Sequence, residues 1–165
     1  MENQDNIQAY WDKFKSQARI KANRYAAWSF GNTKEMADDL AELVVKGVKT
    51  ATTSALDLYE PDEAKPFVGE YNIILDGSEN PVCITKTVVV EIVPFKFVSQ
   101  EHAYHEGEGN RSLQQWRKEH TNKMEKYSTK MLRVYVRYFK SSFIDKHPFK
   151  ACYYSLKKEQ SYGYD

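Results

Sequence analysis

The stretch Asn32–Ser54, NTKEMADDLAELVVKGVKTATTS, contains the change of pattern that decides the fold class. Its first part repeats apolar residues at helical spacing, and these are Met36, Ala37, Leu40, Leu43 and Val44. Asn32 and Glu35, three residues apart, predict a capping box at the start of this helix, and Gly47 predicts its end after Lys46. Beyond Gly47 the apolar period shortens from about 3.6 to 2 residues, which indicates strands.

Three later segments carry the strand pattern. Tyr71–Leu75 (YNIIL) and Val82–Val93 (VCITKTVVVEIV) flank the turn cluster DGSENP, and Met131–Phe139 (MLRVYVRYF) is the third. In the second segment the residues expected to share an inward face are Val82, Ile84, Val88, Val90 and Ile92. In the third segment one face is expected to hold Leu132, Val134, Val136 and Tyr138, and the other Arg133, Tyr135 and Arg137.

Helices are expected in three further places: Ile7–Ile20, Ser99–Glu106, and from Ser112 to about Met124. A short aromatic segment, RYAAWSFGN (24–32), is predicted to be a strand or an irregular edge. Few helices among several strands, without regular βαβ alternation, indicate the α+β class. A small, partly open β-barrel flanked by helices fits this order of elements, although periodicity alone does not establish a barrel.

The composition is typical of a folded, soluble chain. At 165 residues, one domain with a sizeable core is expected. No apolar run reaches the roughly 18 residues of a membrane span, and the polar N-terminus lacks the apolar core of a signal peptide. Cys83 and Cys152 are too few for a disulfide framework or a cysteine zinc site. We therefore expect a cytoplasmic protein with no membrane partner, and no protein partner is implied.

The charges are distributed unevenly along the chain. Residues 29–109 contain 6 Lys/Arg and 15 Asp/Glu, whereas residues 110–158 contain 13 Lys/Arg and 3 Asp/Glu. A basic block of this kind can bind an anionic partner such as RNA. It can equally pack against the acidic half of the chain, so that the two halves neutralise each other.

The segment after Gly47 places a lysine beside several hydroxyl side chains, an arrangement that can activate a nucleophile. In an extended chain Lys49 and Thr53 face the same side, whereas a turn would bring Lys49 near Thr52. The sequence does not decide between these alternatives. Threonines are also common in ordinary strands, so the segment could equally be a polar strand edge.

A second polar cluster, EHAYHEGEGNRSLQQW, spans Glu101–Trp116. His102 and His105 lie three residues apart on the expected helix and could share a metal ion. A third ligand is not evident, so we expect no metal and no other cofactor. Glu106 lies beside a glycine turn, where it could act as a general acid or base or remain a solvated carboxylate.

A third candidate is the strand face formed by Arg133, Tyr135 and Arg137. Arginines that alternate with an aromatic residue can bind phosphates and stack on a base, which would make this face an RNA-binding surface. Exposed strand faces often carry the same pattern without binding anything.

Three motifs, in this order, resemble the ASCH domain family (activating-signal-cointegrator homology). They are WSFGNTKEMADDLAELVVKGVKTATTS (28–54), VGEYNIILDGSENPVCITKTVVVEIVPF (68–95) and EGEGNRSLQQW (106–116). The resemblance places an ASCH domain over residues 28–140, with an N-terminal helical extension over 1–27 and a basic, tyrosine-rich extension over 141–165. It implies a small PUA-like β-barrel flanked by helices, related to RNA-binding domains, with a cleft lined by the Lys49 segment.

The resemblance also implies candidate site residues. Some small bacterial members are amidohydrolases that remove the acetyl group from N4-acetylcytidine, and their catalytic residues match Lys49, Thr52 and Glu106. Those hydrolases lack the EGEGNRSLQQW continuation, which places this chain in a longer branch and leaves its substrate open. The candidates for contacting a nucleoside are Trp28, Thr50, Tyr59, Arg111 and Trp116.

In the hydrolase hypothesis Thr52 attacks the amide carbonyl, Lys49 takes its proton, and Glu106 passes a proton to the leaving amine. Because a lysine accepts a proton only when neutral, Glu106 should be protonated or share one proton with Lys49. A charged Lys49 would instead polarise the carbonyl or hold a phosphate. Three functions therefore remain open: a nucleoside amidohydrolase, a non-catalytic RNA-binding module and a ribonuclease.

Overall fold

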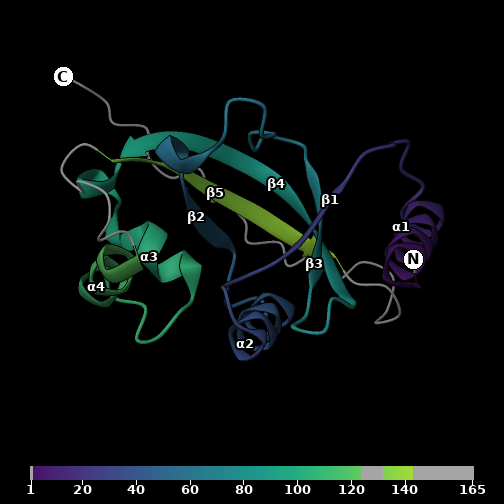
Figure 1. The fold of residues 1–165 in the computed structure, drawn as a ribbon, viewed down its shortest axis with the longest axis horizontal. Helices are drawn as coiled ribbons and strands as arrows, with labels where there is room; N and C mark the ends of the chain where they lie inside the picture. Colours follow the sequence, from purple (N-terminus) through teal and green to yellow (C-terminus); the bar gives the residue numbers. More distant parts are fainter. Residues whose placement is uncertain (1, 124–131, 143–165) are drawn as a thin grey trace, which may run out of the picture.

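The fold is built on one mixed sheet of five strands (Figure 1). The computed structural model describes residues 2–123 and 132–142. The strands are β1 (Ala26–Ser29), β2 (Ala51–Ala55), β3 (Tyr71–Leu75), β4 (Pro81–Pro94) and β5 (Arg133–Ser142). Their order in the sheet is β1-β3-β4-β5-β2, with β1 parallel to β3 and every other pair antiparallel. The sheet curves into an open half-barrel in which β1 and β2 are the edge strands.

Four α-helices of the described residues flank this sheet. They are α1 (Glu2–Ala18), α2 (Lys34–Val45), α3 (Gln100–Glu106) and α4 (Leu113–Lys123), and 3-10 turns lie at Leu56–Leu58 and Phe95–Phe97. Figure 1 shows α1 at one end of the sheet, α3 and α4 together near the other end, and α2 between them. This architecture confirms the expected α+β class and the open, barrel-like sheet flanked by helices. None of these helices is both long enough and apolar enough to cross a membrane.

The helices are held on the sheet by three apolar clusters, because each helix buries one face. The first joins α1 to the sheet through Trp11, Phe14, Ile73, Leu75 and Ile84. The second joins α2 to the sheet through Phe30, Leu40, Ala41, Val44, Ile74, Cys83 and Phe139. The third surrounds α3 and α4 and contains Ala55, Phe95, Val98, Ala103, Trp116, Leu132, Val134 and Val136. Helix α1 therefore packs on the same sheet as the ASCH-like segment.

The predicted capping box of α2 is wrong by one residue. The N-cap is Thr33, whose hydroxyl accepts a hydrogen bond from the backbone N–H of Met36 at 3.2 Å. Asn32 and Glu35 therefore do not form the reciprocal pair, since the box would need its partner at position 36. The end of the helix agrees with the prediction, because Gly47 takes a left-handed conformation with φ +70°.

The predicted inward face of the second strand segment is also wrong in its C-terminal half. The pairing of β4 with β5 shifts between Thr87 and Val89, which leaves Val88 as an extra residue. A bulge of this kind exchanges the two faces of a strand from that point on. Of the three residues expected to be buried here, Val88 and Ile92 are exposed at 37% and 54%, and Val90 is half-buried.

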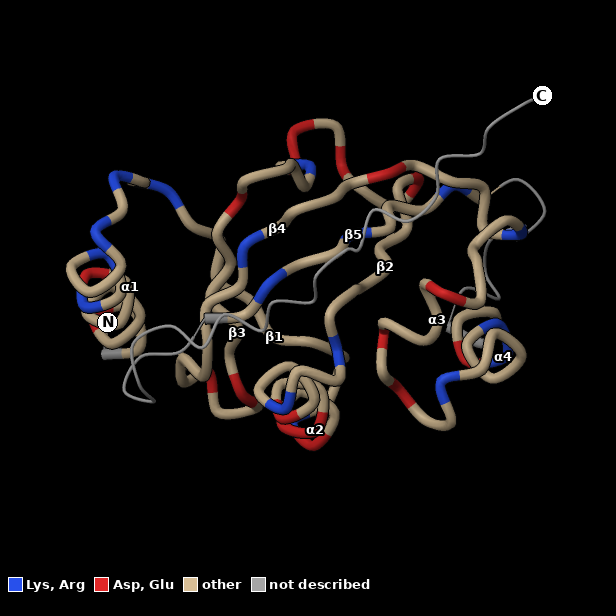
Figure 2. Tube along the Cα trace, turned by 180° about the vertical axis from the view of Figure 1, so that it is seen from behind, with Lys and Arg blue, Asp and Glu red and all other residues tan. Residues whose placement is uncertain are grey.

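Strand β5 does not present its three predicted RNA-binding side chains on one open surface. Arg133 is exposed, Tyr135 is buried, and Arg137 is half-buried. The strand lies between β4 and β2, and both of these neighbours belong to the acidic part of the chain, residues 29–109. Figure 2 shows acidic residues gathered on α2 and basic residues along β5. The predictions for Met124, Met131, Cys152 and the tail beyond residue 142 lie outside the described residues.

Candidate functional site

Strand β2 brings the Lys49 segment against the C-terminal end of α3. The chain leaves α2 through Gly47, and the backbone N–H of Thr50 donates to the carbonyl of His105 at 2.8 Å. On the opposite side the carbonyl of Thr50 accepts from the N–H of Phe139 on β5 at 2.9 Å. Lys49 is therefore fixed between α3 and the sheet and is only 1% exposed.

Two carboxylates converge on Lys49, one from the last residue of α3 and one from the turn that follows it. The Lys49 Nζ donates to the Glu106 carbonyl at 3.2 Å, to Glu106 Oε2 at 3.2 Å and to Glu108 Oε1 at 2.7 Å. Three acceptors match the three N–H groups of an ammonium. Gly107 makes this possible, because its left-handed conformation (φ +76°) turns the chain back between the two glutamates.

The other oxygen of Glu106 is surrounded by hydrogen-bond donors. Glu106 Oε1 accepts from Thr53 Oγ1 at 2.5 Å and from Trp116 Nε1 at 2.8 Å, and His102 Nε2 lies 3.1 Å away. Burial favours the neutral acid, but the charge of Lys49 and the hydrogen bond from His102 outweigh it, so the pKa of Glu106 lies below its usual range. This low pKa favours an ionised Glu106 over the protonated or proton-sharing Glu106 of the hydrolase hypothesis.

The two histidines of α3 contact different partners. His102 is buried, and its Nε2 lies 2.7 Å from Thr53 Oγ1. His105 Nδ1 lies 2.9 Å from Thr50 Oγ1. Both rings therefore fix β2 to α3, and among the described residues no group of three or more His, Cys, Asp or Glu side chains is arranged to hold a metal ion.

Beside this cluster lies a cavity of about 300 Å³. It is lined by Trp28, Ser29, Phe30, Gly31, Leu40, Lys49, Thr52, Thr53, Ser54, Glu106, Glu108, His120 and Arg137. Its volume is at the lower end of the range for small-ligand sites. The structure thus brings Lys49, Thr52, Glu106 and Trp28 together at one cavity, as the site hypothesis requires.

Thr52 and Thr53 have different surroundings, although they are adjacent. Thr52 is paired with Arg137 across β2 and β5, so both side chains lie on the cavity face of the sheet. Within the described residues the Thr52 hydroxyl makes no hydrogen bond, whereas the Thr53 hydroxyl is bound to Glu106 and His102. Of the two hydroxyls, that of Thr52 is available to a ligand.

The remaining predicted ligand contacts lie around the cluster rather than in the cavity. Thr50 binds His105, and Trp116 binds Glu106. The hydroxyl oxygen of Tyr59 lies 2.9 Å from Ser54 Oγ, at the border of the cavity. Arg111 is turned away: its guanidinium lies over the Tyr104 ring, and its Nε donates to the Tyr104 carbonyl.

Two residues of the site, Glu108 and His120, were not predicted from the sequence. Glu108 stands between two glycines in EGEG, a pattern that could have suggested a carboxylate presented by a turn. His120 follows Trp116 by one helical turn, and its ring stacks on the indole with centroids 4.1 Å apart. Because Trp116 donates a hydrogen bond to Glu106, this spacing also places His120 beside Glu106.

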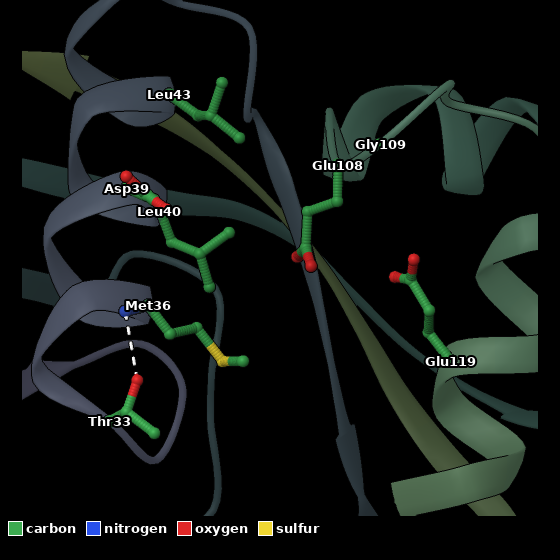
Figure 3. A pocket seen from close by; sticks show the side chains of 8 residues that line it. All are labelled: Thr33, Met36, Asp39, Leu40, Leu43, Glu108, Gly109 and Glu119. Carbon is green, nitrogen blue, oxygen red and sulfur yellow. Dashed lines mark hydrogen bonds between the residues drawn. The ribbon is translucent and has the colours of Figure 1, made fainter.

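A second, larger cavity of about 610 Å³ adjoins the first (Figure 3). Its walls are α2, α4 and the turn that follows α3. Its lining residues are Thr33, Met36, Asp39, Leu40, Leu43, Glu108, Gly109 and Glu119. Leu40 and Glu108 border both cavities. Glu108 therefore separates the acidic outer cavity from Lys49.

Substituting each of the two threonines by valine tests their different roles. Thr53→Val is expected to lower the free energy of unfolding by about 1–3 kcal/mol, because a buried carboxylate loses a donor. Thr52→Val is expected to change it by less than about 0.5 kcal/mol, because no hydrogen bond within the described residues is removed. Urea unfolding followed by tryptophan fluorescence measures both. Equal losses in the two variants would contradict this assignment.

The half-barrel sheet, flanked by helices and carrying a lysine–carboxylate cluster at an open cavity, defines an α+β protein of the PUA-like class. The chain belongs to the ASCH domain family, whose model matches residues 26–138. It is similar to the crystal structure of protein EF3133 from Enterococcus faecalis V583, described under family model DUF984. The TM-score is 0.73 at 32% identity, covering 87% of this chain and 97% of that one.

It is also similar to the crystal structure of an ASCH domain from Lactobacillus crispatus JV V101. The TM-score is 0.72 at 26% identity, covering 84% of this chain and 92% of that one. No curated protein sequence matches the chain.

Proposed function

We propose that this ASCH domain binds a nucleoside or an RNA base in the 300 Å³ cavity and removes an acyl group from an exocyclic amine, as in N4-acetylcytidine. The observation that supports this most is the position of the Thr52 hydroxyl. It lines the cavity beside Lys49 and Glu106 and makes no hydrogen bond within the described residues. Trp28, on the same cavity, provides an aromatic face of the kind on which bases stack.

In this reaction Thr52 Oγ adds to the acyl carbonyl carbon, and the bond from that carbon to the exocyclic nitrogen breaks. The ammonium of Lys49 first gives a proton to the leaving nitrogen, and the neutral amine that results then takes up the proton of Thr52, which restores the ammonium. The proton count of the Lys49–Glu106–Glu108 cluster is then unchanged, and Glu106 stays ionised throughout. Water hydrolyses the acyl-threonine and restores the hydroxyl.

A non-catalytic base-binding module is the second candidate, and one observation favours it. All three N–H groups of Lys49 are occupied by Glu106 and Glu108. A lysine in that state contributes charge balance rather than proton transfer unless a ligand displaces Glu108. Binding without turnover is the result that this candidate predicts.

Turnover of free N4-acetylcytidine by the wild type and by Thr52→Val tests the proposal. The variant is expected to lose activity by roughly 100-fold or more, because the nucleophile is gone. Thr50→Val is the matched control, since the Thr50 hydroxyl contacts His105 instead of the cavity, and it is expected to keep most of the activity. A folded wild type that binds the compound without turning it over would leave the binding module as the function. Full activity in Thr52→Val would remove Thr52 from the mechanism.

A further inference from the structure

Arg137 is a cavity residue whose position the proposed reaction does not use. It lies on β5 opposite Thr52, and its guanidinium carbon is 5.3 Å from the centroid of the Trp28 ring. The indole is itself held in place, because Trp28 Nε1 donates to Asn72 Oδ1 at 2.8 Å. The guanidinium and an aromatic face are therefore presented together on one wall of the cavity.

The guanidinium of Arg137 is not satisfied by the protein around it. Its Nε is buried without a hydrogen-bond partner, and no hydrogen bond of this side chain is present within the described residues. Burial lowers the pKa of Arg137, while the charges of Glu70 and Glu106 act in the opposite direction from a distance. An arginine nevertheless stays charged in proteins, so a half-buried guanidinium, with a buried Nε–H that lacks an acceptor, is left for another partner.

The neighbouring cations differ from Arg137 in this respect. Lys49 is fully occupied by Glu106 and Glu108. Arg133, two residues before Arg137 on the same strand, is exposed and pairs with Asp57 at 2.7 Å. Among the described residues that line the cavity, the positive charge without a close acceptor is therefore that of Arg137.

We infer that Arg137 binds a negatively charged phosphate oxygen of the ligand, so that the cavity takes a nucleotide, as the free monophosphate or within an RNA strand, in preference to a free nucleoside. This rests on the proposed function, because it assumes that the base lies beside Trp28. A guanidinium forms two parallel hydrogen bonds to a phosphate, which would satisfy the donors that the protein leaves open. The phosphate then lies next to the base that contacts the indole.

Calorimetric titration with cytidine, cytidine 5′-monophosphate and inorganic phosphate tests this inference. The wild type is expected to bind the monophosphate about 10-fold or more tightly than cytidine, because hydrogen bonds to a charged phosphate add at least this much to the affinity. Arg137→Gln is expected to remove that difference, because the glutamine side chain brings no positive charge to the phosphate. Arg133→Gln, on the same strand but paired outside the cavity, is expected to keep the difference. Arg137→Lys, which keeps the charge without the fork, should keep part of it.

The outcomes separate the inference from the function on which it rests. Equal binding of cytidine and its monophosphate by the wild type, or a difference that survives in Arg137→Gln, overturns the phosphate role while the nucleoside proposal stands. If neither compound binds but inorganic phosphate does, and Arg137→Gln abolishes that, the anion site stands and the nucleoside proposal fails. Tighter binding of a cytidine trinucleotide than of the monophosphate identifies an RNA strand as the source of the phosphate.

A stability measurement tests whether Arg137 has a structural role instead of a role in ligand binding. Because the side chain makes no hydrogen bond within the described residues, Arg137→Gln is expected to unfold at the wild-type temperature or above it. A clear drop in its unfolding temperature would show that the guanidinium stabilises the fold and would overturn the inference.

Discussion

Replacing Lys49 by methionine is expected to lower the free energy of unfolding by about 3–5 kcal/mol at neutral pH. The substitution keeps the apolar stem but removes the charge that pairs with Glu106 and Glu108. Glu106 is only 2% exposed and would keep a buried negative charge without its cation. Breaking a buried pair on one side costs more than the pair itself contributes, because the remaining ion is not solvated.

The loss should depend on pH in a defined direction. In the wild type the pKa of Glu106 lies below its unfolded value near 4.5, so its contribution to stability is present above pH 4.5 and is lost as the pH falls towards the folded value. Without Lys49, the first-named of the influences that lower the pKa of Glu106 is lost, whereas burial, which raises it, remains, so the pKa of Glu106 should be higher than in the wild type. The variant then gains stability by taking up a proton. The difference between wild type and Lys49→Met should therefore be largest at neutral pH and should narrow below pH 4.5.

Lys46→Met is the matched control for this measurement. Lys46 also pairs with a glutamate, Glu42, at 2.7 Å, but both side chains are more than half exposed. An exposed pair of this kind contributes less than about 0.5 kcal/mol, so the control should unfold almost as the wild type does. Urea unfolding between pH 3.5 and 7 compares the three proteins. A loss in Lys49→Met as small as that in Lys46→Met would mean that Glu106 is not held by Lys49.

Periodicity predicted the elements of the fold better than their local details. The strand at Tyr71–Leu75 agrees residue for residue, because it is short and its apolar run ends at a turn cluster. The cap of α2 was misplaced because Asn32 and Thr33 are adjacent residues that both favour the N-cap position. The bulge at Val88 has no signal in a run of three valines, since a bulge depends on how β5 pairs with β4.

For the candidate site, too, the sequence predicted which residues are involved better than it predicted their contacts. The resemblance to the family selected Lys49, Thr52 and Glu106, which lie at one cavity. The low pKa of Glu106 could not be predicted from the sequence, because the donors to its carboxylate include Thr53 on β2 and Trp116 on α4, 53 and 10 residues away. Arg133 and Arg137 look equivalent in the alternation of β5, yet one is tied to Asp57 and the other faces the cavity. Only tertiary packing separates them.

Gly107→Ala is expected to lower the free energy of unfolding by about 3 kcal/mol. Gly107 has φ +76°, and a Cβ at this position would lie 2.8 Å from the carbonyl oxygen of Val48 and 3.0 Å from the backbone nitrogen of Lys49. About 1 kcal/mol of the loss comes from the left-handed backbone, and the rest comes from the clash. Because the clash is with backbone, relief requires moving either the turn that holds Glu106 and Glu108 or the start of β2.

Gly47→Ala separates these two costs, because Gly47 has almost the same backbone conformation, with φ +70°, but nothing lies within 4 Å of its added Cβ. This control should lose only the backbone cost of about 1 kcal/mol and should keep the Lys49 cluster intact. Gly107→Ala should lose more and should also bind ligand more weakly, since any shift separates Lys49 from its carboxylates. Chemical unfolding and nucleotide titration of both variants measure these effects. Equal losses in stability would mean that the turn after α3 yields without disturbing β2, and that the contact between Gly107 and Val48 does not set the geometry of the site.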